Sequence, residues 1–343
     1  MVRFASFLRF SPLEKLLSDA KRAEQEGFQV VCYGDHLLYP PLENQVYDAW
    51  LVLTQIALGT KRVQVSPCVT DIYRRHPAQM AQTIATLDRM SNGRAFVMLG
   101  AGEAMNLSPF GINYEPKIKK LKEAIDILRL LWTAKSGEPV DYDGEFFKLH
   151  DAYLQLKPIQ KPSPPIYLSA LSPKSMKLAA TQADGWLTHI ETPETFLKGL
   201  TKVKAYAEES GRRAELDTAL FLPIAISNNE NTAKSCMRRA KGILTLRPDK
   251  LNEAGYSISI PDELKMKNFL LDSKGHALFQ DYFNSIPDEW VEPFVAAGNT
   301  DQCIEKIDRF VKNGAKLLIL VNLNPDSSEF YRLVGSKVIP YFS

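Results

Sequence analysis

The stretch that decides the fold covers residues 96–106 and reads Phe96-Val97-Met98-Leu99-Gly100-Ala101-Gly102-Glu103-Ala104-Met105-Asn106. A short apolar run ends in two glycines, and a single carboxylate, Glu103, follows the second of them. This pattern predicts a buried strand whose end can be approached closely, because glycine has no Cβ in the way. We interpret the stretch as a place where a flat cofactor lies against bare backbone, beside an acid that exchanges a proton with it.

Outward from this stretch, predicted strands and helices alternate along nearly the whole chain. The strands are expected at residues 3–8, 28–33, 62–69, 95–99, 165–169, 185–188, 218–226 and 316–321. The helices are expected at residues 12–27, 49–58, 78–90, 117–132, 174–181, 193–210, 232–246 and 300–313. Eight strands alternating with helices in 343 residues predict an α/β fold, a parallel (β/α)8 TIM barrel. A doubly wound open sheet is the alternative.

Two segments interrupt the alternation. Residues 133–162 include Asp143-Gly144, a typical turn between the two short strands of a hairpin. Residues 247–298, before the last helix–strand unit, form an irregular excursion that we expect to shape the substrate site. Its apolar side chains fit either a pocket wall or an ordinary packed insertion; they are Phe269, Leu270, Leu271, Phe279, Tyr282, Phe283 and Trp290. No linker marks a second domain, so we expect one domain over residues 1–343.

Composition excludes several classes of protein. A net charge of +2 favours neither a nucleic acid nor an anionic membrane as partner, and no apolar run is long enough to span a membrane. The four cysteines, Cys32, Cys68, Cys236 and Cys303, are far apart, which argues against a disulfide framework or a zinc site. The amino terminus resembles a strand rather than a signal peptide. We therefore expect a cytoplasmic protein that acts on a small molecule.

The candidate chemistry lies where the predicted strands end, because barrel enzymes act at the carboxyl ends of their strands. His36, His76, His189 and Glu103 all follow such ends and are expected on one rim. A histidine exchanges protons near neutral pH, so His36 and Glu103 are the candidate acid–base residues. The alternatives are a histidine that bonds only loop backbone and a glutamate that only favours a helix N-terminus.

Two segments are candidates for binding a phosphate group. Arg74, Arg75 and His76 form a basic cluster, which is either solvated or close to a phosphate-bearing cofactor. Residues 172–175 open a helix, and its free backbone amides make a better phosphate cradle. The Gly100-x-Gly102 pattern lacks the third glycine and the first-strand position of a nicotinamide fingerprint. No motif with metal-ligand spacing is present, and no metal is expected.

With these residues assembled, the chain resembles the bacterial luciferase-like superfamily, and within it the branch of deazaflavin (coenzyme F420)-dependent oxidoreductases. The resemblance spans residues 20–324. It is strongest in Gly34-Asp35-His36, Thr70-Asp71 through Arg74-Arg75-His76-Pro77, Gly102-Glu103-Ala104-Met105-Asn106, Pro109-Phe110-Gly111-Ile112 and Ala183-Asp184-Gly185.

The resemblance implies a barrel with an insertion, assembled as a homodimer or a larger homo-oligomer. It implies that His36 is the base on a substrate hydroxyl and that Glu103 protonates the deazaflavin ring. It also implies a non-prolyl cis peptide at Cys68-Val69, forming a bulge behind the ring. The implied cofactor-binding residues are Asp35, Cys68, Val69, Thr70, Ala101, Gly102, Asn106, Ala170, Leu171, Ser172, Lys174 and Ser175.

Three positions depart from the branch. Pro40 stands where its dehydrogenases carry a tryptophan, and Leu171-Ser172-Pro173 replaces a common Gly-Gly-Pro. No lysine follows Thr188-His189, as one does in the glucose-6-phosphate enzymes, so a sugar phosphate substrate is not expected. The resulting hypothesis is an F420-dependent oxidoreductase acting on an alcohol/carbonyl pair. The alternatives are a methylenetetrahydromethanopterin reductase, an FMN-dependent monooxygenase and a non-catalytic flavin-binding protein.

Overall fold

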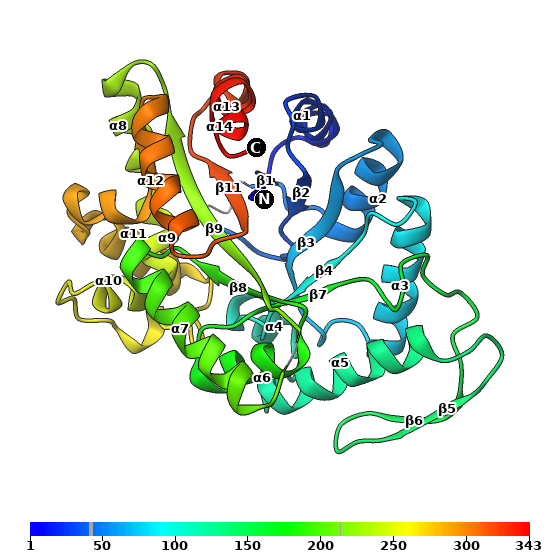
Figure 1. Cartoon of the computed structure of the whole chain (residues 1–343). Coiled ribbons are helices and arrows are strands. Elements are labelled where there is room, and N and C mark those ends of the chain that lie inside the picture. The colour runs from blue at the N-terminus through cyan, green and yellow to red at the C-terminus, as the bar shows by residue number, and fades with distance from the viewer. Residues whose placement is uncertain (41–43, 213) are drawn as a thin grey trace.

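The computed structural model describes residues 1–40, 44–212 and 214–343. Within these residues, eight parallel strands pair in the order β9-β11-β1-β2-β3-β4-β7-β8, and β8 pairs with β9 to close the barrel (Figure 1). The strands are β1 (Arg3–Leu8), β2 (Val30–Tyr33), β3 (Gln64–Thr70), β4 (Val97–Leu99), β7 (Ile166–Ser169), β8 (Gly185–His189), β9 (Asp217–Ile226) and β11 (Leu317–Asn322). The predicted (β/α)8 barrel is confirmed, and each predicted strand overlaps an observed one.

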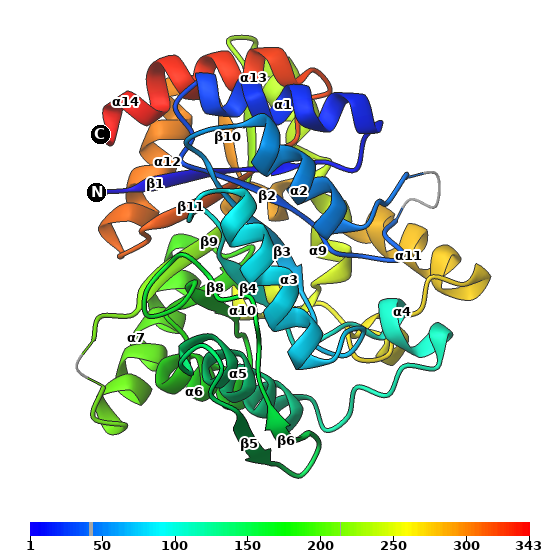
Figure 2. The same cartoon turned by 90° about the vertical axis from the view of Figure 1, so that its right-hand side faces the viewer.

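Helices surround the barrel on the outside (Figure 1). They are α1 (Leu13–Gln25), α2 (Ala49–Gly59), α3 (Pro77–Met90), α5 (Lys117–Thr133), α6 (Pro173–Gln182), α7 (Pro193–Glu209), α12 (Thr300–Lys312), α13 (Ser327–Leu333) and α14 (Ile339–Tyr341). Figure 2 shows α13 and α14 running beside α1, with the two chain ends close together. Several of these helices begin at capping boxes, as at Ser172 and Thr192, which satisfy amides that the first turn leaves unpaired.

The strands are apolar on both faces because they lie between the barrel interior and the helices. One cluster of buried side chains fills the interior, among them Phe96, Met98 and Leu187. A larger cluster packs the outward faces of the strands against the helices. No helix in the described part of the chain is long and apolar enough to cross a membrane.

The predicted hairpin is present as β5 (Val140–Asp143) and β6 (Lys148–Ala152), which pair antiparallel and project from the barrel (Figure 1). The buried carboxylate of Glu123 on α5 holds its turn, because it accepts from the amides of residues 145, 146 and 147 at 2.8–3.1 Å. Asp88 on α3 similarly accepts from the amides of Ile159 and Gln160. The hairpin segment is thus attached through two buried carboxylates.

The segment after β9 differs from the prediction. The helix expected over 232–246 is broken at Arg238-Arg239 into α8 (Glu230–Met237) and α9 (Ala240–Leu246). The two arginines bind different partners. Arg238 pairs with Asp288 at 2.6 Å, and Arg239 donates to the Leu323 carbonyl. The excursion is also more regular than expected; it contains α10 (Asp249–Glu253), α11 (Ser273–Ser285) and the strand β10 (Ala296–Gly298), which extends the sheet beside β9.

The excursion has a hydrophobic core of its own, built from Phe269, Phe279, Tyr282 and Phe294. This core packs on barrel-rim residues such as Met105, and none of the four aromatic side chains lines the main cavity. Of the two interpretations of these aromatic residues, the packed insertion is therefore the correct one. The wall that the excursion gives to the cavity comes instead from polar and aliphatic residues at 246–249, 260 and 265–267.

Candidate active site

A cavity of about 1180 Å³ opens at the carboxyl ends of the barrel strands. Most of the predicted site residues line it: Asp35, His36, Cys68, Val69, Thr70, Ala101, Gly102, Glu103, Asn106, Leu171, Ser172, Lys174 and Ser175. Ala170 does not line it, because its side chain is fully buried in the outer core and its carbonyl accepts the Trp186 indole N–H at 2.8 Å. The cavity exceeds the ~300–1,000 Å³ that is usual for one drug-sized ligand. It therefore has room for a large ligand and a small one together.

The floor of the cavity is the bulge at the end of β3. The Cys68-Val69 peptide bond is cis, and the pairing register between β3 and β4 shifts between Cys68 and Thr70. Gly100 follows β4 directly and lies against this bulge, where a Cβ on residue 100 would stand 2.6 Å from Val69 Cγ2. A side chain does not fit there, so Gly100 permits the close approach that its sequence context predicted.

His36 and Glu103 meet across the cavity from the loops that follow β2 and β4. His36 Nδ1 lies 3.4 Å from Glu103 Oε2, and both side chains are largely buried. Glu103 precedes the short helix α4 (Ala104–Leu107), but its carboxylate caps none of that helix's amides. Glu103 thus stands at the start of a helix, where the macrodipole favours a negative charge, but its carboxylate contacts His36 and Asn106 instead of the helix amides.

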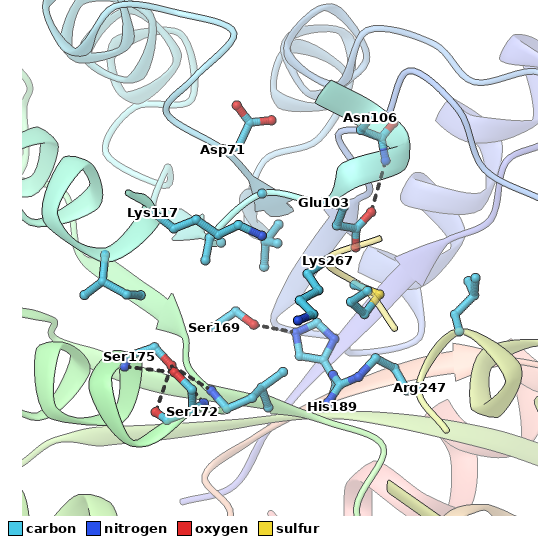
Figure 3. A pocket seen from close by; sticks show the side chains of 18 of the residues that line it. Asp71, Glu103, Asn106, Lys117, Ser169, Ser172, Ser175, His189, Arg247 and Lys267 are labelled. Atoms are coloured by element: carbon cyan, nitrogen blue, oxygen red, sulfur yellow. Dashed lines mark hydrogen bonds between the residues drawn. The ribbon is translucent and has the colours of Figure 1, made fainter. Parts of the chain in front are cut away.

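Asn106 joins the two residues. Its Oδ1 accepts from the backbone amides of Leu37 and Leu38 at 2.7 and 2.8 Å, which fixes the orientation of the amide group. Its Nδ2 then lies 3.0 Å from His36 Nδ1 and 3.0 Å from Glu103 Oε2 (Figure 3 shows the bond to Glu103). Asn106 thus positions both candidate acid–base groups and ties the loop after β2 to the rim of the cavity.

This cluster sets the charge of Glu103. Burial raises the pKa of Glu103, but the charge of His36 and the hydrogen bonds from His36 and Asn106 outweigh it, so its pKa lies below the ordinary value. Glu103 is therefore ionised at neutral pH. Burial and, to a smaller extent, the negative charge of Glu103 raise the pKa of the neighbouring Tyr39 to about 12. Its hydroxyl therefore stays protonated.

His189 also faces the cavity, at the end of β8. In the sequence, its position after a predicted strand was the only indication that it lies on this rim. Its Nε2 is 2.9 Å from Ser169 Oγ, and its ring stacks on Phe221 (Figure 3). Burial, and next the positive charge of Arg247, lower the pKa of His189 to about 3. This imidazole is neutral at all ordinary pH values and can only donate or accept a hydrogen bond.

The predicted basic cluster does not face the cavity as a source of charge for a phosphate. Arg74 pairs with Asp71 at 2.6 Å and with Asp35 at 3.0 Å, and Arg75 pairs with Asp48 at 2.7 Å. His76 lies outside the cavity wall and caps α3, with Nδ1 accepting from the Ala78 amide. These side chains are already partnered and hold the loop after β3 in place. Asp35 in turn accepts from the Thr70 hydroxyl at 2.6 Å.

The predicted phosphate cradle is partly occupied by its own serines. The amides of Leu171 and Ser172 donate to Ser175 Oγ at 3.1 and 3.0 Å, and the Ser175 amide donates to Ser172 Oγ (Figure 3). The amides of Leu171, Ser172 and Ser175 are thus bonded within the loop. The polar groups that this end of the cavity offers a ligand are the serine hydroxyls and the ammonium groups of Lys174 and Lys177.

Fold and site together define the class: a (β/α)8-barrel protein with a histidine–glutamate pair in a cavity at the carboxyl ends of its strands. The chain belongs to the luciferase-like monooxygenase family, whose model matches residues 5–317. The predicted family is confirmed.

Several relatives are similar over almost their whole length. A 5,10-methylenetetrahydromethanopterin reductase of Archaeoglobus fulgidus is 29% identical, covering 99% of this chain and 98% of the relative. The structure of an F420-dependent secondary alcohol dehydrogenase with an F420–acetone adduct is 27% identical, with a TM-score of 0.83 and 98% of each chain covered. That of the coenzyme F420-dependent tetrahydromethanopterin reductase of Methanopyrus kandleri is 26% identical, with a TM-score of 0.83 and coverage of 100% and 99%. These relatives belong to the branch that the sequence motifs predicted.

Proposed function

We propose that this chain is a coenzyme F420-dependent oxidoreductase that acts on a small alcohol/carbonyl pair. The observation that carries the proposal is the cluster of His36, Asn106 and Glu103 in a cavity whose floor is the Cys68-Val69 bulge. The relatives named above support the cofactor, because two of them are F420-dependent by name.

The residues present fit a deazaflavin. The cavity has room for a planar ring system beside a small substrate. Gly100 lets the end of β4 lie directly against the bulge, because a Cβ there would meet the Val69 side chain. Cys68, Val69, Ala101 and Gly102 would lie along the ring, and the α6 end, with Ser172 and Lys174, would hold its phosphate-bearing side chain. When bound, the deazaflavin supplies the atom, C5, that gives or takes the hydride.

The chain's own residues handle the protons. Because Asn106 Nδ2 donates to His36 Nδ1, the neutral imidazole carries its proton on Nε2. That N–H can donate a hydrogen bond to a substrate oxygen. Loss of a proton from the neutral ring would leave an imidazolate, so proton transfer to the oxygen of a reduced carbonyl group requires His36 to be protonated on Nδ1 as well. Protonation of Nδ1 as well would place its N–H toward the ionised Glu103 at 3.4 Å, so His36 and Glu103 together can hold the proton that the reaction moves.

The test is an anaerobic assay of purified protein with F420 and a panel of secondary alcohols, and with reduced F420 and the matching ketones. Reduction or oxidation of F420 that depends on the substrate supports the proposal. Oxygen consumption with reduced FMN, and none with F420, would instead identify a monooxygenase. Binding of F420 without turnover of any alcohol, pterin or imine would identify a non-catalytic binding protein.

A second candidate is the reduction of a C–N double bond in methylenetetrahydromethanopterin. The similarity to the Archaeoglobus reductase favours it. Adding this pterin and reduced F420 to the same assay separates the two candidates, because only the reductase would oxidise F420 with the pterin and not with ketones.

A further inference from the structure

Three cations reach the same part of the cavity from two different elements. Lys117 comes from the first turn of α5, while Arg247 and Lys267 come from the excursion (Figure 3). Figure 3 shows their charged groups directed toward the space near His189 and Glu103. None of the three was singled out by the sequence motifs.

Lys117 is a largely buried ammonium group whose charge is poorly balanced. Its side chain is 19% exposed, and Nζ lies 4.5 Å from the centre of the Tyr114 ring. Its nearest carboxylate among the described residues, that of Glu115, is 3.9 Å away and mostly in solvent. Burial lowers the pKa of Lys117, Glu115 and Glu103 oppose this, and Lys267 lowers it further. A buried cation without a close anion is costly, and a bound anion would remove that cost.

The other cations of α5 behave differently. Lys119 and Lys122 lie at the outer edge of the cavity, are more than half exposed, and pair with Glu145 and Asp126 at 2.9 and 2.8 Å. Lys117 is the member of this row that turns inward, and its side chain is the least exposed of the three. Water and a close carboxylate therefore stabilise the charges of Lys119 and Lys122, whereas the charge of Lys117 has little of either.

Arg247 completes the site from the other side. Its Nε and Nη2 both bond Asp249, at 3.0 and 2.6 Å, and within the described ranges Nη1 has no hydrogen-bond partner. Only 10% of its side chain is exposed. Lys267 is exposed at the mouth of the same cavity, and it has no ion-pair partner in the part of the chain that the structure covers. Guanidinium and ammonium groups gathered in this way are typical of a carboxylate or phosphate site.

We infer that the substrate carries an anionic group, a carboxylate or a phosphate, that is bound by Lys117, Arg247 and Lys267. This inference rests on the proposed function and names its substrate class. The three cations come from α5 and the excursion, whereas Lys174 and Lys177 belong to α6, at the end where the cofactor's phosphate would bind. Residues of α5 and the excursion would hold the anionic group of the substrate. Its binding therefore does not require the lysine that the glucose-6-phosphate enzymes carry after the strand equivalent to β8.

The experiment is a calorimetric titration of the F420-loaded protein with inorganic phosphate at constant ionic strength. We expect one saturable site. Replacing Lys117 or Lys267 by Met should weaken it roughly tenfold each, as expected for one lost charge-assisted hydrogen bond. Lys117→Arg should keep most of the affinity. The control is Lys274→Met, an exposed residue of the same excursion that pairs with Glu263 and should change nothing.

Three outcomes would overturn the inference. One is a loaded protein that binds no phosphate. Another is phosphate affinity that Lys117→Met and Lys267→Met leave unchanged while both variants keep the wild-type melting temperature. The third is phosphate that binds the apo protein and is displaced by F420, because the anion would then be the cofactor's own.

Failure of the inference and failure of the proposed function are separable. Binding of F420 is followed independently by its fluorescence before any phosphate is added. If F420 binds and phosphate does not, only the anionic substrate is excluded. If F420 does not bind, the proposed function fails, and the same titration on the apo protein still shows whether Lys117 and Lys267 form an anion site.

Discussion

His36 Nδ1 and Glu103 Oε2 lie 3.4 Å apart, although 66 residues separate them in the chain. The loops after β2 and β4, two strands separated by β3 in the barrel, bring them together, and one amide group, that of Asn106, contacts both. The proposed chemistry depends on this pair, because it combines a proton donor for the substrate with an ionised partner.

Replacing His36 by Ala should lower kcat for F420 turnover by roughly 10²–10⁴, the usual contribution of a general acid or base. The Kd for F420 should not change, because the proposed function places His36 beside the substrate and not beside the cofactor. Steady-state kinetics and fluorescence titration measure the two quantities. His76→Asn is the matched control, since Asn can cap α3 in its place and His76 lies outside the cavity wall. Full turnover by His36→Ala would exclude its catalytic role.

Asn106→Asp should shift the pH profile of kcat toward higher pH. The new carboxylate still accepts from the amides of Leu37 and Leu38, but it replaces the donor to Glu103 by a second negative charge. A like charge raises the pKa of Glu103, so this carboxylate takes up its proton at higher pH. Asn113→Asp, at an exposed position of the same loop, is the control. An unshifted profile would show that Asn106 does not position this pair.

His189 should make the folded state sensitive to acid. Its pKa is about 3 in the folded protein and near the ordinary value of 6.5 in the unfolded chain, so the unfolded chain takes up a proton first. This contribution to the free energy of unfolding is complete above pH 6.5 and is lost as the pH falls from 6.5 toward 3. The loss is at most about 1.4 kcal/mol per pH unit.

Urea unfolding at pH 8, 6 and 4.5 measures this effect. In His189→Gln the free energy of unfolding should change less with pH than in the wild type. The variant His150→Gln, at an exposed position, should keep the wild-type dependence on pH. Equal slopes for all three proteins would show that His189 is not held neutral.

A buried ion pair attaches the excursion to the barrel. Lys250 Nζ on α10 lies 2.5 Å from Glu191 Oε1 after β8, and both side chains are 5% exposed. The hydroxyls of Thr188 and Thr195 also donate to the Glu191 carboxylate at 2.6 Å. Lys250→Met leaves this carboxylate buried without its cation, which should lower the free energy of unfolding by about 3–5 kcal/mol.

The double variant Lys250→Met/Glu191→Gln should recover part of that loss, because the unpaired charge is removed as well. Lys234→Met breaks an exposed pair with Glu230 and should cost under about 1 kcal/mol. Urea unfolding measures all three variants. If Lys250→Met were as mild as Lys234→Met, the pair would not hold the excursion in place.

The barrel could be predicted from the sequence because its strands are continuous apolar runs separated by helices of regular period, signals that lie within short windows. The excursion could not. Its elements α10 and β10 are short, and the packing of the excursion on the barrel rim is a long-range effect. The break at Arg238-Arg239 likewise depends on Asp288 and Leu323, which are distant in the chain.

The candidate site divides in the same way. His36 and Glu103 follow strand ends directly, so strand position alone predicted them. The bridging contacts of Asn106, and the inward turn of Lys117, depend on how loops meet in space and carry no local signal. The bonds from Trp186 to the Ala170 carbonyl and from the Ser172 amide to Ser175 likewise depend on the folded structure, and no local pattern predicted them. The homodimer and the cytoplasmic location stay predictions.

The most direct test of the central claim is an anaerobic fluorescence titration of the apo protein with F420 and, separately, with FMN. The account predicts saturable binding of F420 and substrate-dependent turnover of the bound cofactor, with FMN bound more weakly. Gly100→Ala should weaken F420 binding, since its Cβ would meet Val69 at the floor of the cavity. Tight binding of FMN with no measurable binding of F420 would contradict the account.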